Sequence, residues 1–192
     1  MKFNINHFNK IEGWCDNGII ELYKSMAYTH NNATFVEIGS WKGKSSFCMA
    51  SLIEEQNKNI KFYCIDIWKH SDQYSNDLDV INDSLFDAFK KNTELVKNYI
   101  KPIQLPSLEA AKQFEDESLD FVFIDAAHDY ENVKNDINAW YPKVKKGGTI
   151  GGHDYHPTWS GVVKAVDEWR YAENKLISVA VTSWFHHKIS SN

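Results

Sequence analysis

The stretch Val36-Glu37-Ile38-Gly39-Ser40-Trp41-Lys42-Gly43-Lys44-Ser45-Ser46 (VEIGSWKGKSS) joins a short apolar run to a helical pattern through two glycines. The run, residues 34–38, has the length and apolar character of a buried strand. The residues that follow place Phe47, Ala50 and Ile53 on one helical face. A strand that enters a helix through a glycine loop is typical of α/β folds that bind a ligand at that loop.

The same alternation of strand and helix continues along the chain. Further strands are expected at 61–67, 100–105, 119–125 and 148–152, with Gly147-Gly148 as the stop before the last of these. Runs at 176–181 and 184–189 predict an antiparallel hairpin. The pattern therefore predicts an α/β fold, a doubly wound and mostly parallel sheet of seven strands with a C-terminal antiparallel hairpin. Pro102 cannot donate to a ladder, which places its strand at a sheet edge.

Two segments stand outside this alternation. Residues 1–31 form an N-terminal lead-in with a predicted helix at 16–30. Residues 70–83 are polar, carry Asp72, Asp77, Asp79 and Asp83, and show no clear period, so a solvated loop and a lid over a site are both open. Because no linker or repeat divides the chain, residues 1–192 are interpreted as one domain.

The composition is that of an ordinary globular protein and excludes several function classes. Of the 192 residues 43% are hydrophobic and 24% are charged, and the net charge is −5. Lys and Arg are scattered without the basic stripe of a nucleic-acid binder, and the acidic balance offers no attraction to anionic membranes. No apolar run approaches the roughly 20 residues of a spanning helix. Three cysteines without paired spacing, and no visible signal peptide, predict a cytoplasmic protein.

Three ligand classes compete for the glycine loop. A P-loop needs four residues between its first glycine and the Gly-Lys pair, whereas three separate Gly39 from Gly43. A dinucleotide fingerprint needs a glycine at position 41, where Trp41 would meet the pyrophosphate. S-adenosylmethionine carries no phosphate, so the loop need not form a tight anion nest for it.

S-adenosylmethionine needs an acceptor for its ammonium group and an acid for its ribose hydroxyls. Glu37, at the end of the first strand, is placed for the ammonium group. Asp66 ends the second strand, 27 residues after Gly39, and is placed for the ribose. Ile67 and Trp68 follow it and offer an apolar wall for the adenine. The alternative is that Glu37 and Asp66 only cap neighbouring helices.

Three stretches, VEIGSWKGKSS, YCIDIW and LDFVFIDAAHDYENVKNDINAWYPKVKKGGTIGGHDY, resemble the class I S-adenosylmethionine-dependent methyltransferases. The resemblance is closest to the subgroup of macrolide-sugar and other small-molecule O-methyltransferases, and it implies a Rossmann-like methyltransferase fold. The signature of that subgroup falls here on Asp125, His128, Tyr130-Glu131, Asp136, Trp140, Gly147-Gly148 and His153-Asp154. The residues expected to contact the cofactor are Glu37, Gly39, Ser40, Trp41, Gly43, Ser45, Asp66, Ile67, Trp68, Ser107 and Asp125.

A second group of polar residues follows the fourth and fifth strands. Neighbouring strands lie about 4.8 Å apart, so side chains at their carboxyl ends can converge on one ion. Asp125, His153 and Asp154 are therefore a candidate site for a divalent cation, either Mg²⁺ or a transition metal. Related metal-dependent enzymes more often have an acid where His153 stands. A hydrogen-bonded polar cluster without an ion is the alternative.

His128 follows Asp125 by three residues, in the turn after the fourth strand. An imidazole can take a proton from a hydroxyl group, and the resemblance implies that His128 is the catalytic base, with Asp125 beside it. The predicted function is O-methylation of a small-molecule acceptor, such as a sugar or another small polar metabolite. A methyltransferase for another atom or a larger acceptor, a non-catalytic S-adenosylmethionine-binding protein, and a homo-oligomer all stay open.

Overall fold

The computed structural model describes residues 3–69 and 75–189. Within these residues seven strands form one sheet in the order β3-β2-β1-β4-β5-β7-β6. The strands are β1 (Ala33–Ile38), β2 (Ile60–Asp66), β3 (Ile100–Gln104), β4 (Leu119–Ile124), β5 (Val144–Gly152), β6 (Ser178–Ala180) and β7 (Ser183–His187). Strands β1 to β5 pair in parallel, and β7 pairs antiparallel with β5 and β6. The predicted sheet, its C-terminal hairpin and the edge position of the strand with Pro102 are confirmed.

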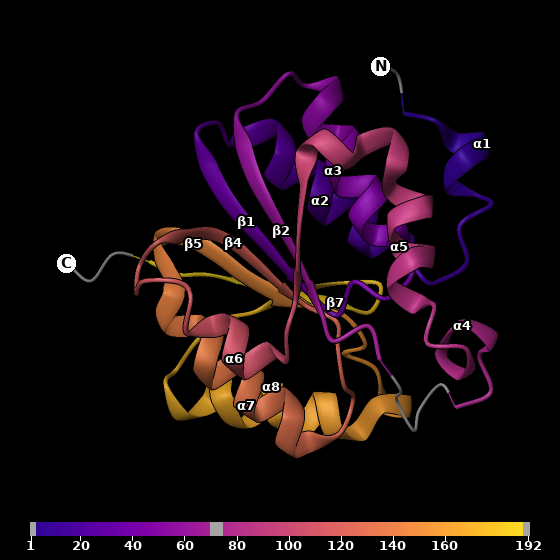
Figure 1. Cartoon of the computed structure of the whole chain (residues 1–192). Helices are drawn as coiled ribbons and strands as arrows, with labels where there is room; N and C mark the ends of the chain where they lie inside the picture. Colours follow the sequence, from indigo (N-terminus) through magenta and orange to yellow (C-terminus); the bar gives the residue numbers. More distant parts are fainter. Residues whose placement is uncertain (1–2, 70–74, 190–192) are drawn as a thin grey trace.

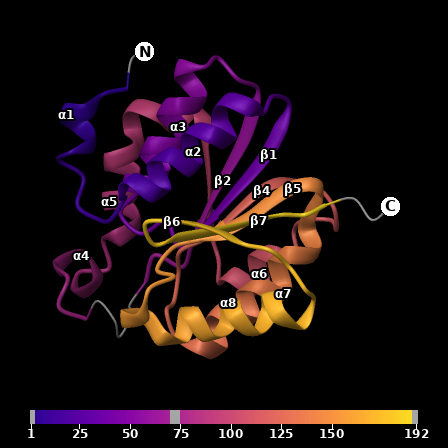
Figure 2. The same ribbon diagram turned by 180° about the vertical axis from the view of Figure 1, so that it is seen from behind.

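Helices cover both faces of this sheet (Figures 1 and 2). One face carries α1 (Ile5–Phe8), α2 (Asn17–Thr29), α3 (Lys44–Glu55) and α5 (Leu85–Thr93). The other face carries α6 (Ser107–Ala111), α7 (Tyr130–Trp140) and α8 (Ser160–Ala172). Short helical turns complete the connections: α4 (Leu78–Ile81), η2 (Glu94–Tyr99), η3 (Tyr141–Lys143) and η4 (Pro157–Trp159). The helix predicted at 16–30 is α2, and the side chain of Asp16 caps its first turn.

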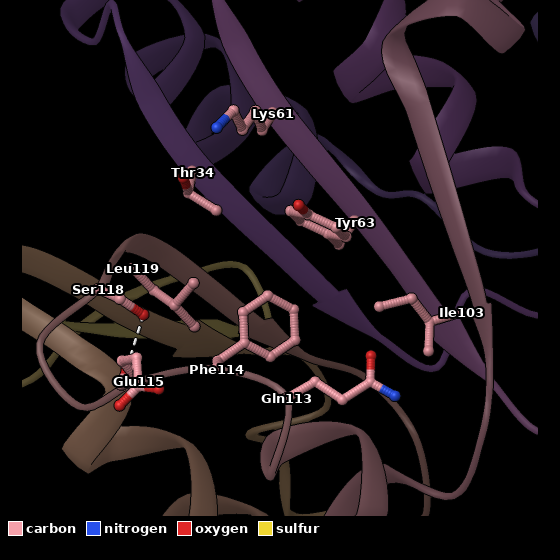
Figure 3. Close-up of a pocket in the computed structure, with 9 residues that line it drawn as sticks. All are labelled: Thr34, Lys61, Tyr63, Ile103, Gln113, Phe114, Glu115, Ser118 and Leu119. Carbon is pink, nitrogen blue, oxygen red and sulfur yellow. Dashed lines mark hydrogen bonds between the residues drawn. The ribbon is translucent and has the colours of Figure 1, made fainter.

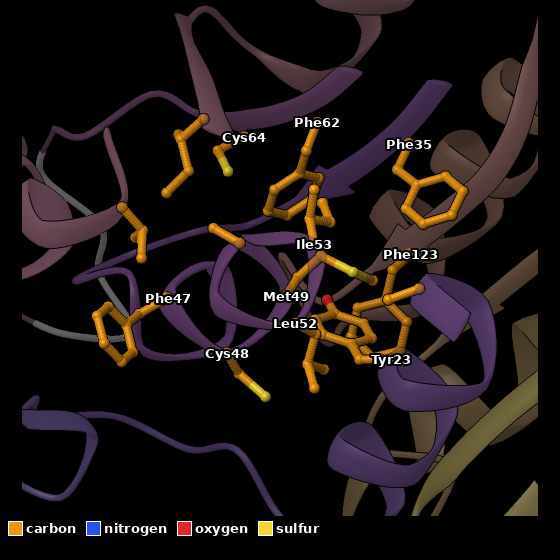
Figure 4. Close-up of a cluster of buried hydrophobic side chains, with 14 of the residues drawn as sticks. Tyr23, Phe35, Phe47, Cys48, Met49, Leu52, Ile53, Phe62, Cys64 and Phe123 are labelled. Carbon is orange, nitrogen blue, oxygen red and sulfur yellow. The ribbon is translucent and has the colours of Figure 1, made fainter. Parts of the chain in front are cut away.

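Alternation along the buried strands separates two hydrophobic cores. On β1, Phe35 packs in the cluster with α2 and α3, whereas its neighbour Val36 packs in the cluster with α7 and α8. Figure 4 shows the first cluster, in which Tyr23 of α2 lies near Phe123 of β4. Burial of one such apolar side chain stabilises the fold by roughly 1.5–3 kcal/mol. Because both faces are covered, the edge formed by the carboxyl ends of the strands is left for a ligand.

Two boundaries differ from the sequence pattern. Strand β5 begins at Val144, so Gly147 and Gly148 lie inside the strand and do not end the preceding element. The ladder is irregular here, because Leu119 pairs with Val144 while Phe121 pairs with Thr149. The spacing of Leu85, Phe89 and Val96 in the sequence favours one continuous helix, but the structure divides it into α5 and η2, because the backbone of Val96 is not helical (φ −122°, ψ 15°).

The polar segment 70–83 is described only in part. Residues 70–74, including Asp72, lie outside the described residues. In the described part, Asp77 caps α4 through Oδ1, which accepts from the backbone N–H of Asp79 at 2.9 Å. Its other oxygen lies 2.7 Å from Nζ of Lys42 in the glycine loop. Residues 77–81 are therefore a helical turn that is ion-paired to the glycine loop. The role of segment 70–83 as a lid over a site stays a prediction.

The glycine loop passes very close to the end of β4. Gly39 has a φ of 88°, and a Cβ atom at this position would lie 2.0 Å from the carbonyl oxygen of Asp125. The backbone N–H of Asp125 in turn donates to the carbonyl of Ile38 at 2.8 Å. Only glycine satisfies both the left-handed backbone and this close approach.

Gly39→Ala is expected to destabilise the protein more than Gly147→Ala does. Gly147 has a similar φ of 82°, but a Cβ atom there would meet nothing within 4 Å. The left-handed backbone costs an L residue about 1–2 kcal/mol at either position. Overlap with Asp125 adds about 1–3 kcal/mol at position 39. Urea unfolding followed by circular dichroism measures both free energies, and equal losses would contradict the steric role of Gly39.

Candidate functional site

The candidate site lies at one edge of the sheet, where β1, β2, β4 and β5 end. These strands are parallel neighbours, so the loops that follow them meet at that edge. The predicted cofactor residues lie in the last residues of β1 and β2 or in the loops after β1, β2 and β4, apart from Ser107, which follows β3 at the same edge. The predicted base and cation residues follow β4 and β5. The structure thus brings the two predicted groups together.

Glu37 is a buried carboxylate beneath the glycine loop. Only 1% of the residue is exposed. Its Oε1 accepts from the Tyr23 hydroxyl at 2.8 Å, and its Oε2 accepts from the hydroxyls of Ser40, at 2.8 Å, and Ser46. Burial raises the pKa of Glu37, and the hydroxyl hydrogen bonds oppose that rise. The carboxylate therefore anchors Ser40 of the loop, and its predicted contact with the cofactor ammonium stays a prediction.

Asp66 connects the loops that follow β1 and β2. Its Oδ2 accepts from the backbone N–H of Trp41 and its Oδ1 from that of Trp68, each at 2.8 Å. The indole N–H of Trp68 donates to the Trp41 carbonyl at 2.7 Å. Both tryptophans have positive φ angles, 41° and 44°, which bulky residues rarely adopt. Strained backbone of this kind is concentrated at functional sites, so it supports a ligand site here.

The two residues after Asp66 differ in exposure. The indole of Trp68 is only 1% exposed and packs against Phe86 and Phe89, with ring centroids 4.6 Å away in each case. The Trp68 indole therefore lies in the core, and the apolar wall expected for adenine does not include it. Ile67 is 39% exposed at the same edge.

Lys42 ties the glycine loop to two other segments, a role that the sequence did not reveal. Its side chain is 5% exposed. Its Nζ lies 2.7 Å from carboxylate oxygens of Glu12 and Asp77, and 2.9 Å from one of Asp79. Breaking a buried ion pair leaves an uncompensated charge, so this contact fixes the loop against the N-terminal segment and α4.

The glycine loop ends in residues that fit it tightly to the core. Gly43 caps α3 with a φ of 85°, and a Cβ atom there would lie 2.7 Å from Cγ2 of Thr93. Ser45, in the first turn of α3, is buried. Gly43 and Ser45 therefore hold the start of α3 against the core. Their contacts with the cofactor stay a prediction.

Ser107 belongs to a buried hydrogen-bonded group. Its hydroxyl donates to Oδ1 of Asp136 at 2.5 Å and accepts from the indole N–H of Trp140 at 2.9 Å. Only 5% of Asp136 is exposed, and burial raises its pKa to about 6. Two residues of the sequence signature, Asp136 and Trp140, thus hold the loop that follows β3.

Asp136→Asn is expected to remove a pH dependence of stability. The pKa of Asp136 is raised to about 6, above its ordinary value of 3.8, so the folded chain binds this proton more tightly than the unfolded chain. The resulting stabilisation is present below about pH 4 and is lost as the pH rises through about 6. The loss is roughly 3 kcal/mol, because each pKa unit corresponds to about 1.4 kcal/mol. Urea unfolding of both proteins from pH 4 to 7 measures it, and a constant difference between them would contradict the assignment.

Two carboxylates and two imidazoles meet at the ends of β4 and β5. Nε2 of His128 lies 2.7 Å from Oδ2 of Asp154 and 4.0 Å from Oδ1 of Asp125. Nδ1 of His153 lies 3.3 Å from Oδ2 of Asp154 and 3.8 Å from Oδ1 of Asp125. Donor atoms of Asp125, His128 and Asp154 lie within 4.8 Å of one another, so His128, as well as the predicted His153, faces the two carboxylates. Two carboxylates and an imidazole at this spacing fit a divalent cation.

The two carboxylates of this cluster differ in acidity. Burial raises the pKa of Asp125 to about 6, although the neighbouring imidazoles oppose the rise. Burial also acts on Asp154, but hydrogen bonds from His128 and His153 outweigh it and hold the pKa of Asp154 well below its usual range. Burial disfavours a charged His153, yet Asp154 and Asp125 raise the pKa of His153 to about 9. Asp154 therefore keeps its negative charge at a lower pH than Asp125 does.

His153 also contacts groups that the sequence did not identify. Its Nε2 lies 3.3 Å from Oδ2 of Asp16 and 2.9 Å from Oγ1 of Thr182. Asp16 precedes α2, and Thr182 lies in the turn between β6 and β7. These partners come from opposite ends of the chain, so no local sequence signal could have found them.

The space around the cluster is narrow. A cavity of about 10 Å³ adjoins Asp125, His128 and His153. The ring of Trp159, which is 37% exposed, stacks on His128 with centroids 4.2 Å apart. The candidate base is therefore bordered by an aromatic surface that solvent can reach.

A larger cavity of about 280 Å³ lies elsewhere, on the sheet face that the short helix α6 covers (Figure 3). Its walls include Tyr63, Ile103 and Phe114, with Lys61 and Glu115 among its polar residues. None of the predicted site residues lines it, so it is separate from the candidate site.

Comparison with solved structures shows the same fold at low sequence identity. The O-methyltransferase NovP aligns with a TM-score of 0.67 and 14% identity, over 89% of this chain and 79% of NovP. A putative caffeoyl-CoA O-methyltransferase from Staphylococcus aureus aligns with a TM-score of 0.65 and 17% identity, over 95% of this chain and 88% of that protein.

Two curated relatives are similar in sequence. An uncharacterized protein of Sinorhizobium fredii is 20% identical over 147 residues, and one of Acanthamoeba polyphaga mimivirus is 32% identical over 154 residues. The matches cover 77% and 79% of this chain but only 16% and 62% of the relatives, so the chain spans less than two thirds of either.

Among the described residues, no helix has both the length and the apolar character needed to cross a membrane. Residues 36–155, from the middle of β1 to just past the Asp154 cluster, match the family model described as a methyltransferase domain. This match spans the glycine loop, Asp66 and the whole cluster, and the resemblance to class I methyltransferases is thereby confirmed. The chain belongs to the methyltransferase domain family.

Proposed function

We propose that this chain transfers the methyl group of S-adenosylmethionine to a hydroxyl oxygen of a small polar acceptor such as a sugar. The observation that carries the proposal is the contact between Gly39 and Asp125, which sets the glycine loop directly against the carboxylate–imidazole cluster. A cofactor on the loop would present its methyl group to an acceptor held at the cluster. Methyl transfer needs this proximity more than it needs covalent help from the protein.

In the proposed reaction His128 is the base. The acceptor oxygen attacks the methyl carbon, the carbon–sulfur bond breaks, and its electron pair stays on sulfur, which yields S-adenosylhomocysteine. The hydroxyl proton passes to the His128 imidazole. Asp154, 2.7 Å from that ring, stabilises the imidazolium that forms.

A divalent cation fits the same cluster. Both imidazoles face the two carboxylates, and in this proposal His153 would complete the cation site with Asp125 and Asp154, while His128 is left as the base. A bound cation lowers the pKa of a hydroxyl group and orients the acceptor. The other polar groups of the site would hold these ligands in position.

The acceptor class rests on the surroundings of His128. The half-exposed indole of Trp159 stacks on the imidazole and presents an aromatic face beside it. Such faces pack against the C–H groups of sugar rings and of other small cyclic compounds, while the cluster supplies polar contacts. NovP shares the fold and carries the name O-methyltransferase, which supports oxygen as the atom methylated.

Asp66→Ala is expected to weaken binding of S-adenosylhomocysteine by about 10- to 100-fold. A hydrogen bond to a charged group contributes roughly 1.5–3 kcal/mol, and this carboxylate also holds the Trp41 and Trp68 backbone. Asp120→Ala is the matched control, because Asp120 also accepts from a backbone N–H but lies at the start of β4. Calorimetry that gives equal affinities for both variants would contradict the role of Asp66.

His128→Ala is expected to lower turnover by about 10²- to 10⁴-fold, the usual contribution of a general base. Its affinity for S-adenosylhomocysteine should stay near that of the wild type. His187→Ala, which removes an exposed imidazole of β7, is the control. The measurement is a mass-spectrometric screen of sugars and other small hydroxyl compounds with S-adenosylmethionine. Cofactor binding without transfer to any acceptor would favour the non-catalytic alternative, and wild-type turnover in His128→Ala would place the base elsewhere.

A further inference from the structure

The cation site proposed above depends on the orientation of one ring, and the structure shows what holds that ring. Nδ1 of His153 faces the carboxylates of Asp125 and Asp154, whereas Nε2 faces Asp16 and Thr182. The side chain of His153 is only 9% exposed. The ring is therefore enclosed between the candidate cation site on one side and the N-terminal segment on the other.

Asp16 is itself held in place. Its Oδ1 accepts from the backbone N–H of Ile19 at 3.0 Å and so caps α2. Its Oδ2 lies 3.3 Å from Nε2 of His153 and accepts from the hydroxyl of Thr182 at 3.1 Å. One oxygen is thus fixed by the helix, and the other is presented to the imidazole.

We propose that Asp16 is a positioning residue that keeps a proton on Nε2 of His153, so that Nδ1 supplies its lone pair when a divalent cation binds beside Asp125 and Asp154. A carboxylate accepts hydrogen bonds but cannot donate one, so it favours the proton on Nε2. The lone pair of Nδ1 then faces Asp125 and Asp154. Carboxylate–imidazole pairs of this kind fix the tautomer and orientation of metal-binding histidines.

This inference rests on the proposed function, because it assumes the cation site of that function. It goes further, because it assigns a role to a residue outside the matched stretch 36–155. Asp16 and His153 lie 137 positions apart in the sequence. The proposed role is argued only from the hydrogen-bonding geometry of Asp16, His153 and Thr182.

The test is the affinity of the full chain for Mn²⁺, measured by electron paramagnetic resonance of the free ion with saturating S-adenosylhomocysteine. Asp16→Asn keeps an acceptor for the α2 cap, since Asn and Asp are about equal at this position. Its amide N–H₂ can donate to Nε2 and so favours the proton on Nδ1, where the cation would bind. We expect Mn²⁺ affinity to fall by roughly 10- to 100-fold.

Two further variants separate positioning from a general loss of charge. Thr182→Val removes the neutral partner of Nε2 and should change Mn²⁺ affinity much less than Asp16→Asn. In a His153→Ala background, Asp16→Asn should cause no further loss, because Asp16 acts through that ring. Urea unfolding should give Asp16→Asn a free energy near the wild-type value, which shows that the cap is intact.

The outcomes separate this inference from the proposed function. Wild-type Mn²⁺ affinity in Asp16→Asn, or an equal loss with and without His153, overturns the role of Asp16 and leaves methyl transfer untouched. A wild-type protein that transfers methyl groups but does not bind Mn²⁺ overturns both the cation site and this role. A protein that binds Mn²⁺ with the expected losses but transfers no methyl group supports the role of Asp16 and contradicts the proposed activity.

Discussion

The carbonyl oxygen of Asp125 occupies the space in which a side chain at position 39 would begin. This contact follows from the parallel register of β1 and β4, in which Ile38 pairs with Ile124. The loop after β1 and the turn after β4 must therefore lie against each other. In the proposed function, the sheet itself would bring a ligand on the glycine loop close to an acceptor at His128, which is the proximity that group transfer needs.

Carboxylates that are buried or partly buried keep these loops in place. Glu37 holds the Ser40 hydroxyl, Asp66 holds the Trp41 and Trp68 backbone, and Asp136 holds Ser107. A carboxylate is costly to bury unless hydrogen bonds replace its water, and here the loops supply those bonds. The desolvated acids and the loop conformations thus depend on each other, which explains why strained residues such as Trp41 and Trp68 persist at this edge.

Much of this arrangement could be predicted from the sequence, because strand runs and glycine positions are local patterns. The strands, their C-terminal hairpin, and the meeting of Gly39, Asp66 and Asp125 at one edge follow from those patterns and the rules of parallel sheets. The direction of a side chain does not follow. Trp68 is buried whereas Ile67 beside it is 39% exposed, and a run of apolar residues does not show which of the two faces the core. The sequence also carries no local signal for the irregular pairing of β4 with β5 near Gly147.

The part of the site that sequence patterns could not reveal comes mainly from the N-terminal segment. Four residues before β1 contact the glycine loop, Glu37 or His153, in the pairs Glu12–Lys42, Trp14–Trp41, Asp16–His153 and Tyr23–Glu37. The family match begins at residue 36, after all four of them. In the proposed function the motif residues supply the reacting groups, and this segment contacts them from outside the motif. Functional groups need such supporting contacts to hold productive geometry, so substitutions at residues 12–23 can alter the site while every motif residue is retained.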